Sequence, residues 1–275
     1  MIELPEAENL SRQLTETVGG KRIAGVVAGL SPHKFAWYHD NPKDYDALLR
    51  GKTVDTAAAR GGMVEVSIGD AVALFSDGTA LRFHTRDEQR PKKHQLLIEF
   101  DDGTAISASV QMYGGLWCFK EGEFDNAYYD AARNKPSPLS DEFDKAYFDN
   151  LITSDEVQKL SAKAFLATEQ RIPGLGNGVL QDILYNARIH PKRTITTLTD
   201  DETKALFHSV KSTLEEMTAQ RGRDTTSDLF GRPGGYATRL SQNTIDKPCA
   251  VCSGTIIKQS YMGGSIYFCD GCQRM

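Results

Sequence analysis

Two CxxC motifs stand at the end of the chain, Cys249–Cys252 and Cys269–Cys272, with 16 residues between them. Four thiolates in this arrangement fit a tetrahedral structural zinc site, because four sulfurs complete the coordination sphere and leave no position for a substrate. Two β-prone runs flank Gly263-Gly264 between the motifs, which predicts a hairpin zinc ribbon. A pair of disulfides and an iron site with the same ligands are the alternatives. A ribbon this small cannot bury its own core, so metal binding would supply its folding energy.

The length and the cysteine content bound the rest of the chain. At 275 residues it is long enough for two domains in addition to the ribbon. No run approaches the roughly 20 apolar residues of a membrane span, and the acidic, amphipathic start is unlike a signal peptide. Cys118 is the one cysteine outside the ribbon, which favours a reducing, cytoplasmic compartment.

The charge is unevenly distributed. The net charge of −5 is unfavourable for a protein that binds nucleic acid. Residues 1–128 hold the whole excess, with 14 Lys and Arg against 19 Asp and Glu. Residues 157–193 contain two acidic residues, Glu169 and Asp182, and six basic residues. This local excess of positive charge is a modest indication of a surface that binds a polyanion. The six are Lys159, Lys163, Arg171, Arg188, Lys192 and Arg193.

The first 128 residues read as a helix followed by short strands. Pro5 begins a helix with a stripe of apolar residues, and Gly19-Gly20 ends it. The turn signals Asp77-Gly78 and Asp101–Gly103 then separate β-type runs, which predicts an antiparallel sandwich or barrel. The runs are residues 22–28, 63–68, 71–75, 80–83, 95–100 and 104–112. The fold class is therefore α+β and multidomain.

A helical domain is predicted over residues 151–240, after a polar linker at 129–150 and before the ribbon at 241–275. Thr153–Glu156 and Thr199–Glu202 are capping boxes that open helices. Between them, Ile172–Asn177 is a glycine-containing turn that begins another helix.

That turn has the features of an anion site. Its glycines, one of them Gly176, allow close approach of a partner, and Asn177 stands where a helix N-terminus presents free N–H groups. A phosphodiester is the obvious anion beside Lys163 and Arg171. The alternative is an ordinary helix–helix turn with an Asn cap.

Residues 173–193, PGLGNGVLQDILYNARIHPKR, resemble the helix–two-turn–helix signature of the formamidopyrimidine-DNA glycosylase and endonuclease VIII family. The order of parts agrees along nearly the whole chain. Met1–Glu8 resembles the acidic N-terminal motif of the family, Gly222–Asp228 and Pro233–Tyr236 follow the helical region, and the ribbon ends in Cys-Gln-Arg. The resemblance implies double-stranded DNA bound between two domains, with a damaged base flipped out of the stack and excised.

The catalytic residues differ from the family pattern. The family nucleophile is usually the amine of an N-terminal proline, which forms a Schiff base that permits strand cleavage. Here position 2 is Ile2, whose amine could act only if Met1 were removed, and bulky second residues resist that removal. With Met1 in place the Ile2 nitrogen is an amide. We therefore expect the lyase step to be weakened or absent.

Glu3 matches the family carboxylate that handles protons or water at the sugar, and Glu6 is a second candidate. Helix N-terminal charge is the alternative role for both. Two family cations that contact phosphates are missing, since Gly62 and Gly264 or Ser265 occupy their positions.

The candidate DNA contacts form a second group. They are Lys163, Arg171, Gly176, Asn177 and Tyr113. Tyr113 could stack on an orphaned base, or be an ordinary loop tyrosine. The loop Gly222–Tyr236 is the expected contributor to the pocket for the damaged base.

The resulting prediction is a DNA glycosylase of base excision repair, a monomer with one structural Zn²⁺, located in the cytoplasm with the nucleoid. Its partner would be duplex DNA that carries a damaged base or an abasic site. A non-catalytic binder of such DNA is the first alternative. An RNA- or ribosome-associated zinc protein is the second, but it would leave Glu3 and the β-domain unexplained.

Overall fold

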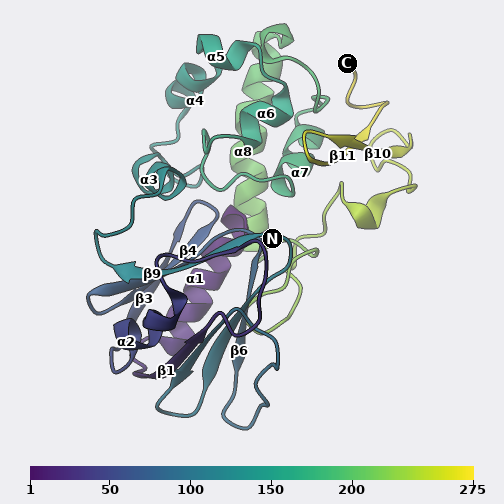
Figure 1. The fold of residues 1–275 in the computed structure, drawn as a ribbon. Helices are drawn as coiled ribbons and strands as arrows, with labels where there is room; N and C mark the ends of the chain where they lie inside the picture. Colours follow the sequence, from purple (N-terminus) through teal and green to yellow (C-terminus); the bar gives the residue numbers. More distant parts are fainter.

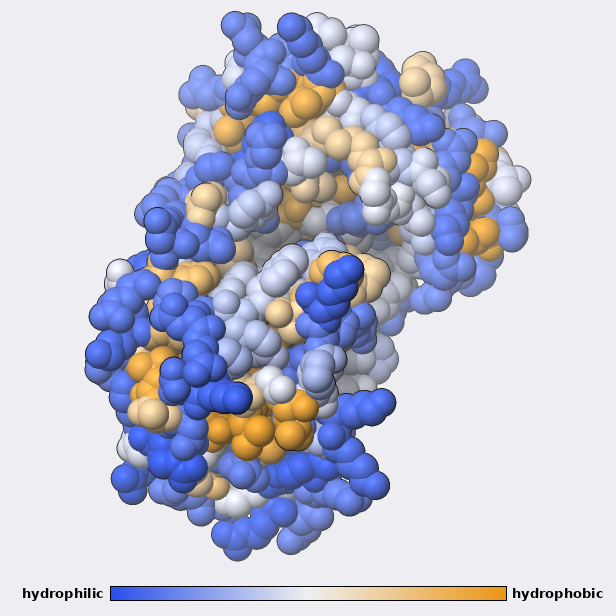
Figure 2. All heavy atoms as spheres, in the orientation of Figure 1, coloured by the Kyte–Doolittle hydropathy of each residue, from blue (hydrophilic) through white to orange (hydrophobic).

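The structure, a computed structural model, describes residues 1–275 (Figure 1). A β-rich lobe contains helix α1 (Leu4–Val18), and a helical lobe is built around the long helix α8 (Asp200–Ala219). A two-stranded hairpin near the C-terminus lies beside the helical lobe, and the N-terminus lies between the two lobes. The surface is hollowed between the lobes on the face drawn in Figure 2. No helix combines the length and the apolar character needed to cross a membrane.

Helix α1 begins and ends as its sequence predicts. Glu3 is the N-cap, and its backbone N–H donates to Glu6 Oε2 at 3.1 Å, which closes a capping box. Pro5 costs no hydrogen bond in the first turn. Gly19 follows the last helical residue, and Gly20 takes a left-handed φ of 79° that turns the chain toward the first strand.

The apolar residues of α1 are divided between two cores. Ala7, Leu10, Leu14 and Val18 are buried in the core of the β-lobe, whereas Leu4 is buried in the core of the helical lobe. The first turn of α1 is therefore the place where the two cores meet.

Two sheets and α1 share the core of the β-lobe. The first sheet has the order β1-β7-β8-β6 and is antiparallel throughout. The second has the order β2-β9-β5-β4-β3, in which only β2 and β9 pair in parallel. The strands are β1 (Ile23–Ala28), β2 (Ala36–Trp37), β3 (Val54–Arg60), β4 (Met63–Ile68), β5 (Ala71–Phe75), β6 (Thr79–His84), β7 (Leu96–Phe100), β8 (Ala105–Val110) and β9 (Gly114–Lys120). The predicted sandwich with a helix at its start is confirmed.

Three strands and two short helices of this lobe have no counterpart among the predicted runs. Strand β3 has the sequence VDTAAAR, whose alanines carry little β-propensity, so its pairing with β4 decides its conformation. Strand β9 pairs with β5 and brings Trp117 and Cys118 into the second sheet. The remaining elements are β2, the 3-10 helix η1 (Pro42–Asp44) and α2 (Tyr45–Leu49).

The segment predicted as a linker contains two helices, α3 (Ala127–Asn134) and α4 (Lys145–Ile152). Their N-caps are Asn126 and Asp144, whose side chains accept backbone N–H groups of the first turn. The polar residues that suggested a linker are therefore helix caps and exposed faces. Phe148 of α4 is fully buried in the core of the helical lobe.

The helical lobe continues with α5 (Asp155–Gln158), α6 (Ala162–Ala167), α7 (Val179–Asn186), the 3-10 helix η2 (Ile195–Thr197) and α8. The capping box predicted at Thr199 and Glu202 is present at the start of α8. The one predicted at Thr153 is not formed. The N-cap of α5 is Ser154, without a side-chain hydrogen bond, and α5 is a single turn.

The C-terminal unit is the predicted hairpin. After the 3-10 helix η3 (Gln242–Thr244), β10 (Ile256–Tyr261) pairs antiparallel with β11 (Gly264–Cys269). The turn residues Met262 and Gly263 have φ of 50° and 70°, as a tight two-residue hairpin turn requires.

Candidate active site

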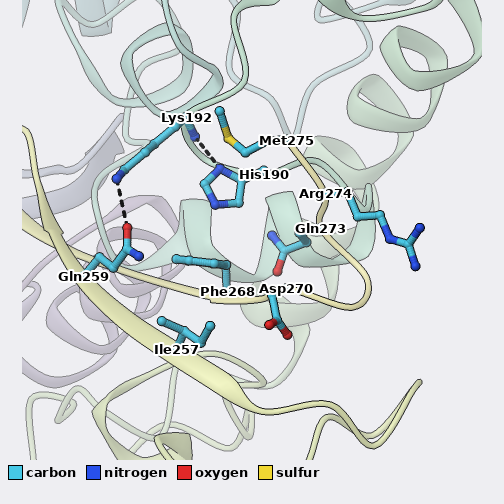
Figure 3. Close-up of a pocket in the computed structure, with 9 residues that line it drawn as sticks. All are labelled: His190, Lys192, Ile257, Gln259, Phe268, Asp270, Gln273, Arg274 and Met275. Atoms are coloured by element: carbon cyan, nitrogen blue, oxygen red, sulfur yellow. Dashed lines mark hydrogen bonds between the residues drawn. The ribbon is translucent and has the colours of Figure 1, made fainter.

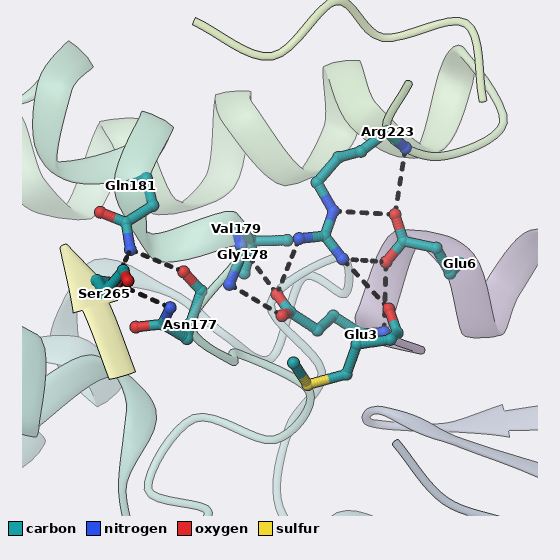
Figure 4. Close-up of polar contacts among 9 residues, drawn as sticks. Glu3, Glu6, Asn177, Gly178, Val179, Gln181, Arg223 and Ser265 are labelled. Carbon is teal, nitrogen blue, oxygen red and sulfur yellow. Dashed lines mark hydrogen bonds and ion pairs between the residues drawn. The ribbon is translucent and has the colours of Figure 1, made fainter. Parts of the chain in front are cut away.

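The carboxylate of Glu3 binds the N-terminus of helix α7 (Figure 4). Gly178 N donates to Oε1 at 2.8 Å and Val179 N donates to Oε2 at 2.7 Å, and Glu3 is only 2% exposed. The sequence predicts a phosphodiester at these N–H groups. In the structure the anion is Glu3 of the same chain, which the helix dipole stabilises in the same way.

The glycines of the turn before α7 make room for the N-terminal segment. A Cβ at Gly176 would lie 2.7 Å from Glu3 Cδ, and a Cβ at Gly174 would lie 2.8 Å from Leu4 Cβ. Gly174 also has a φ of 83°, which favours glycine. The close approach predicted for this turn is therefore an approach of Glu3 and Leu4.

The guanidinium of Arg223 contacts the carboxylates of both Glu3 and Glu6. Its Nε and Nη2 donate to Glu6 Oε1 and Oε2 at 2.9 and 2.7 Å, and its Nη1 lies 3.5 Å from Glu3 Oε2. Arg223 is 3% exposed, and its backbone N–H also donates to Glu6 at 3.0 Å. Burial alone would raise the pKa of Glu6, but the charge and hydrogen bonds of Arg223 hold that pKa below its ordinary value. The three side chains form one buried charged cluster.

The amino-terminal residue lies against this cluster. The Met1 carbonyl accepts from Arg223 Nη2 at 3.3 Å. Burial and the charge of Arg223 lower the pKa of the Met1 α-amine, against the opposing charges of Glu3, Glu6 and Asp77. The side chain of Ile2 is 2% exposed in the core of the β-lobe. An α-amine therefore lies in the site even with Met1 in place, which reasoning from Ile2 alone overlooks.

Asp77 is a further carboxyl group at the junction. Tyr113 Oη donates to Asp77 Oδ2 at 3.3 Å, and the rings of Tyr113 and Trp37 lie 5.8 Å apart. Burial, together with the negative charge of Glu3, raises the pKa of Asp77 to about 6. The neighbouring Met112 is 61% exposed. Tyr113 is thus at the edge of the site, partly engaged by its own chain.

Asn177 joins α7 to the hairpin (Figure 4). Its Nδ2 donates to the Ser265 carbonyl at 2.9 Å. Gln181 Nε2 donates to the Asn177 carbonyl at 2.8 Å, and Gln181 Oε1 accepts from Tyr267 N at 3.0 Å. The N-cap of α7 is Gly178 rather than Asn177.

Lys163 and Arg171 are not brought to this cluster. Lys163 is 5% exposed and its Nζ donates to the Tyr261 carbonyl at 2.7 Å, so it holds the hairpin against α6. Arg171 is 7% exposed and bonds locally to Thr168 and Glu169. Both basic groups are already paired within the chain.

The four cysteines of the CxxC motifs converge. All four Sγ atoms lie within 4.8 Å of one another, with 3.7 Å between Cys249 and Cys272 and 3.4 Å between Cys252 and Cys269. Four sulfurs this close, in no disulfide, fit the donor set of a tetrahedral metal site.

A cavity of about 460 Å³ opens between the hairpin, the C-terminal residues and the segment after α7 (Figure 3). Lys192 crosses it to Gln259 at 2.8 Å. Gln273 lines it and anchors the hairpin by donating to the Ile189 carbonyl at 3.0 Å. None of the candidate catalytic residues lines this cavity, so it is separate from the Glu3 cluster.

Arg223 and Asp77 are the site residues that the sequence does not single out. Arg223 lies within the motif Gly222–Asp228, and Asp77 lies in a hairpin turn, so each has an ordinary local explanation. Their proximity to Glu3 is a property of the tertiary fold. The only sequence feature that could have indicated a role for Arg223 is its place within Gly222–Asp228, a segment that resembles the family.

Comparison with known proteins identifies the domains. The profile of the formamidopyrimidine-DNA glycosylase N-terminal domain matches residues 1–113, and that of the formamidopyrimidine-DNA glycosylase H2TH domain matches residues 135–228. A formamidopyrimidine-DNA glycosylase of Bacillus cereus is 29% identical over 284 residues that cover 99% of each chain. One of Wolbachia pipientis is 29% identical over 285 residues that cover 99% of this chain and 100% of the relative.

Solved structures agree in fold. The complex between the Lactococcus lactis Fpg and an abasic site containing DNA matches with a TM-score of 0.84 and 24% identity, over 99% of this chain and 100% of that one. MutM in complex with carbocyclic 8-oxo-G containing DNA matches with a TM-score of 0.82 and 23% identity over the same shares. With two family domains in the expected order, the chain belongs to the formamidopyrimidine-DNA glycosylase and endonuclease VIII family.

Proposed function

We propose that this protein is a DNA glycosylase of base excision repair, which binds duplex DNA between its two lobes and releases an oxidised or ring-opened base. The observation that carries the proposal is the carboxylate of Glu3, fixed by two N–H groups of α7 and by Arg223 at the junction of both family domains. Full-length relatives named formamidopyrimidine-DNA glycosylase support it. Such an enzyme acts where the chromosome lies, in the cytoplasm with the nucleoid.

Glu3 has the chemistry of a general base. It would accept a proton from a water molecule whose oxygen bonds to the sugar C1′. The bond between C1′ and the base nitrogen breaks as that bond forms, and its electron pair leaves on the base, which takes up a proton. An α-amine can replace the water: its nitrogen bonds to C1′ and loses a proton as the base leaves. The C1′–O4′ bond then breaks, O4′ takes up a proton, and C1′ and the nitrogen remain joined as a protonated imine. The lowered pKa of the Met1 amine favours the unprotonated, nucleophilic form.

The contacts to DNA belong to the same proposal. Asn177 and the hairpin turn lie together near the Glu3 cluster, and Tyr113 lies beside it on the β-lobe. A tyrosine there would stack on the base left unpaired after flipping. Lys163 and Arg171 would act indirectly, because their cationic groups are buried and bind other groups of the chain. Lys163 would hold the hairpin in place, and Arg171 would stabilise the turn before α7.

One zinc ion, held by Cys249, Cys252, Cys269 and Cys272, completes the proposal. Its role would be structural, since four thiolates close the coordination sphere. The metal would fix β10 against β11 and so keep Ser265 where Asn177 binds it.

Single-turnover kinetics on duplexes with one ring-opened guanine test the proposed function. Excision is scored after alkaline cleavage at the abasic site, so that it is detected without a lyase step. We expect excision by the parent and a fall of about 10²-fold or more in Glu3→Gln, the scale of a general-base contribution. A parent that binds abasic-site DNA tightly but releases no damaged base would show a non-catalytic binder instead.

A further inference from the structure

We propose that Arg223 is a positioning residue of the active site. It contacts the Met1 carbonyl, Glu3 and Glu6 together and so holds Glu3, the proposed general base, in position for the reaction. The inference rests on the proposed function, because it assigns a role in that reaction. It concerns a side chain that touches no DNA in the proposed arrangement and acts through its neighbours.

One guanidinium, that of Arg223, contacts three groups of the N-terminal segment. Arg223 makes a two-point contact with Glu6, lies 3.5 Å from Glu3 Oε2, and donates to the Met1 carbonyl at 3.3 Å. The planar, five-donor guanidinium can reach these partners at once, which a lysine ammonium cannot do with the same geometry. The Met1 carbonyl and the carboxylates of Glu3 and Glu6 therefore all contact Arg223.

Glycines leave space around the Arg223 side chain and its partners. A Cβ at Gly178 would lie 1.4 Å from Arg223 Nη1 and 2.9 Å from Glu3 Oε1. Gly222, with a φ of 94°, lets the chain leave α8 and present Arg223 to Glu6. Gly178 therefore leaves the space that the Arg223 guanidinium fills, and Gly222 leaves room for Glu6, whose Oε1 would lie 3.3 Å from a Cβ at position 222.

Arg223 also balances the negative charge of two buried carboxylates. Glu3 and Glu6 are 2% and 4% exposed, so two carboxylates share a region with little water. Arg223 is the one cation within ion-pair distance of either. Like charges this close repel strongly at low effective dielectric, and a buried carboxylate without a partner takes up a proton. The Met1 α-amine and the Asp77 carboxyl are the other titratable groups that face this pair.

Arg223 also connects Glu3 to the part of the site that would face the substrate. Arg223 opens the loop Gly222–Tyr236, the part of the chain that we expect to contact the damaged base. The same residue therefore contacts the carboxylates of Glu3 and Glu6 and belongs to this loop. A misplacement of about 1 Å at a catalytic group costs on the order of 10²-fold in rate.

Three variants separate positioning from packing. Arg223→Met removes both the charge and the bridge, and Arg223→Lys keeps the charge but not the bridge. Arg223→Met combined with Glu6→Gln removes the bridge while lowering the buried negative charge, in case the single variant does not fold. Lys204→Gln on the exposed face of α8 is the matched loss of one positive charge. Each is measured for single-turnover rate, KM and the pH dependence of excision.

We expect Arg223→Met to lose about 10²-fold or more in rate with KM within about threefold of the parent, because Arg223 is buried. The acidic limb of its pH profile should move to higher pH, since Glu6 loses the cation that lowers its pKa. Arg223→Lys should keep the parent limb and recover about tenfold in rate. The double variant should fold and remain slow, and Lys204→Gln should match the parent.

A folded Arg223→Met protein with the rate and pH profile of the parent would overturn the proposal. So would equal losses in the Met and Lys variants with an unmoved acidic limb, which would mark Arg223 as a packing residue only. If the parent itself releases no base, the proposed function fails and takes this role with it. That outcome is distinguishable, because it appears in the parent and not in the variants.

Discussion

The guanidinium of Arg223 fills the space where a side chain at Gly178 would lie, since a Cβ at position 178 would be only 1.4 Å from Arg223 Nη1. The backbone of Gly178 has φ −82° and ψ −51°, which alanine adopts without strain. Gly178→Ala should therefore act through its contacts with Arg223 and, at 2.9 Å, with Glu3 Oε1, and not through backbone strain. We expect a loss of about 1–3 kcal/mol in the free energy of unfolding, the scale of overpacking a filled core, measured by urea denaturation.

Gly62→Ala is the control for that substitution, because its Cβ would meet nothing closer than 3.5 Å. It should unfold within about 0.5 kcal/mol of the parent, as substitutions without a clash usually do. Equal stability of the Gly178→Ala and Gly62→Ala proteins would show that Arg223 moves aside at no cost.

The Glu6–Arg223 pair makes stability depend on pH in one direction. The pKa of Glu6 is lowered in the fold, so the ionised form stabilises the protein above its ordinary pKa of 4.5, and this contribution is lost as pH falls through the lowered pKa. Glu6→Gln should cost roughly 3 kcal/mol near pH 7. The difference from the parent should shrink on acidification below about pH 4.5, as the linkage relation requires.

Glu16→Gln, on the same helix, is the control for this pH dependence. Its ion pair with Arg12 is about half exposed and contributes little. A Glu6→Gln difference that stays constant from pH 7 to pH 3 would contradict the assigned pKa direction.

Borohydride trapping on abasic-site DNA tests the amine. With Met1 retained, the α-amine is one residue farther from Glu3 than the family proline would be, so we expect trapping by the parent to be weak. Ile2→Pro, with Met1 removed as intact mass would verify, should trap at least about tenfold more complex, because its secondary amine stands directly before Glu3. Parent protein that traps as efficiently as Ile2→Pro, through Met1 in the mapped peptide, would contradict this.

Metal analysis of untagged protein should find one equivalent of zinc. Cys269→Ala should lose it and expose β10 and β11 to proteolysis, because the ribbon depends on the metal for its folding energy. Cys118→Ala, a buried cysteine of β9, should keep the zinc. A protected ribbon in zinc-free protein would rule out a metal-dependent fold.

Gly62→Lys restores a cation at a position where the family has one. Its Cβ has room, with Ile2 O at 3.5 Å and Glu3 Cα at 3.7 Å. We expect tighter binding to duplex DNA at low salt and a steeper salt dependence by about one ion, measured by fluorescence anisotropy. An unchanged salt slope would place position 62 away from the phosphates.

The parts of this protein that are specified locally could be predicted from its sequence. Capping, glycine stops and turn pairs locate α1, α8 and the hairpin, and the CxxC spacing predicts the cysteine cluster. Strand β3 could not be predicted, because its alanines favour no strand until β4 pairs with them.

The candidate site divides in the same way. Glu3 and Glu6 follow from the resemblance, whereas Arg223 comes from a position 217 residues beyond Glu6 and has no periodic signal. The turn before α7 shows the limit most clearly. Its glycines correctly indicate a close partner, but only the fold reveals that the partner is Glu3 rather than a phosphate.

The first turn of α1 is held by both lobes, with Ile2 and Ala7 in one core, Leu4 in the other and Glu3 on α7. Because this segment packs in the cores of both lobes, it cannot move independently of either lobe. If the lobes rotate relative to each other to admit a duplex, the displacement should therefore be smallest at Glu3 and largest at the outer edges of the lobes. The carboxylate of Glu3 would then keep its position while the two lobes move around it.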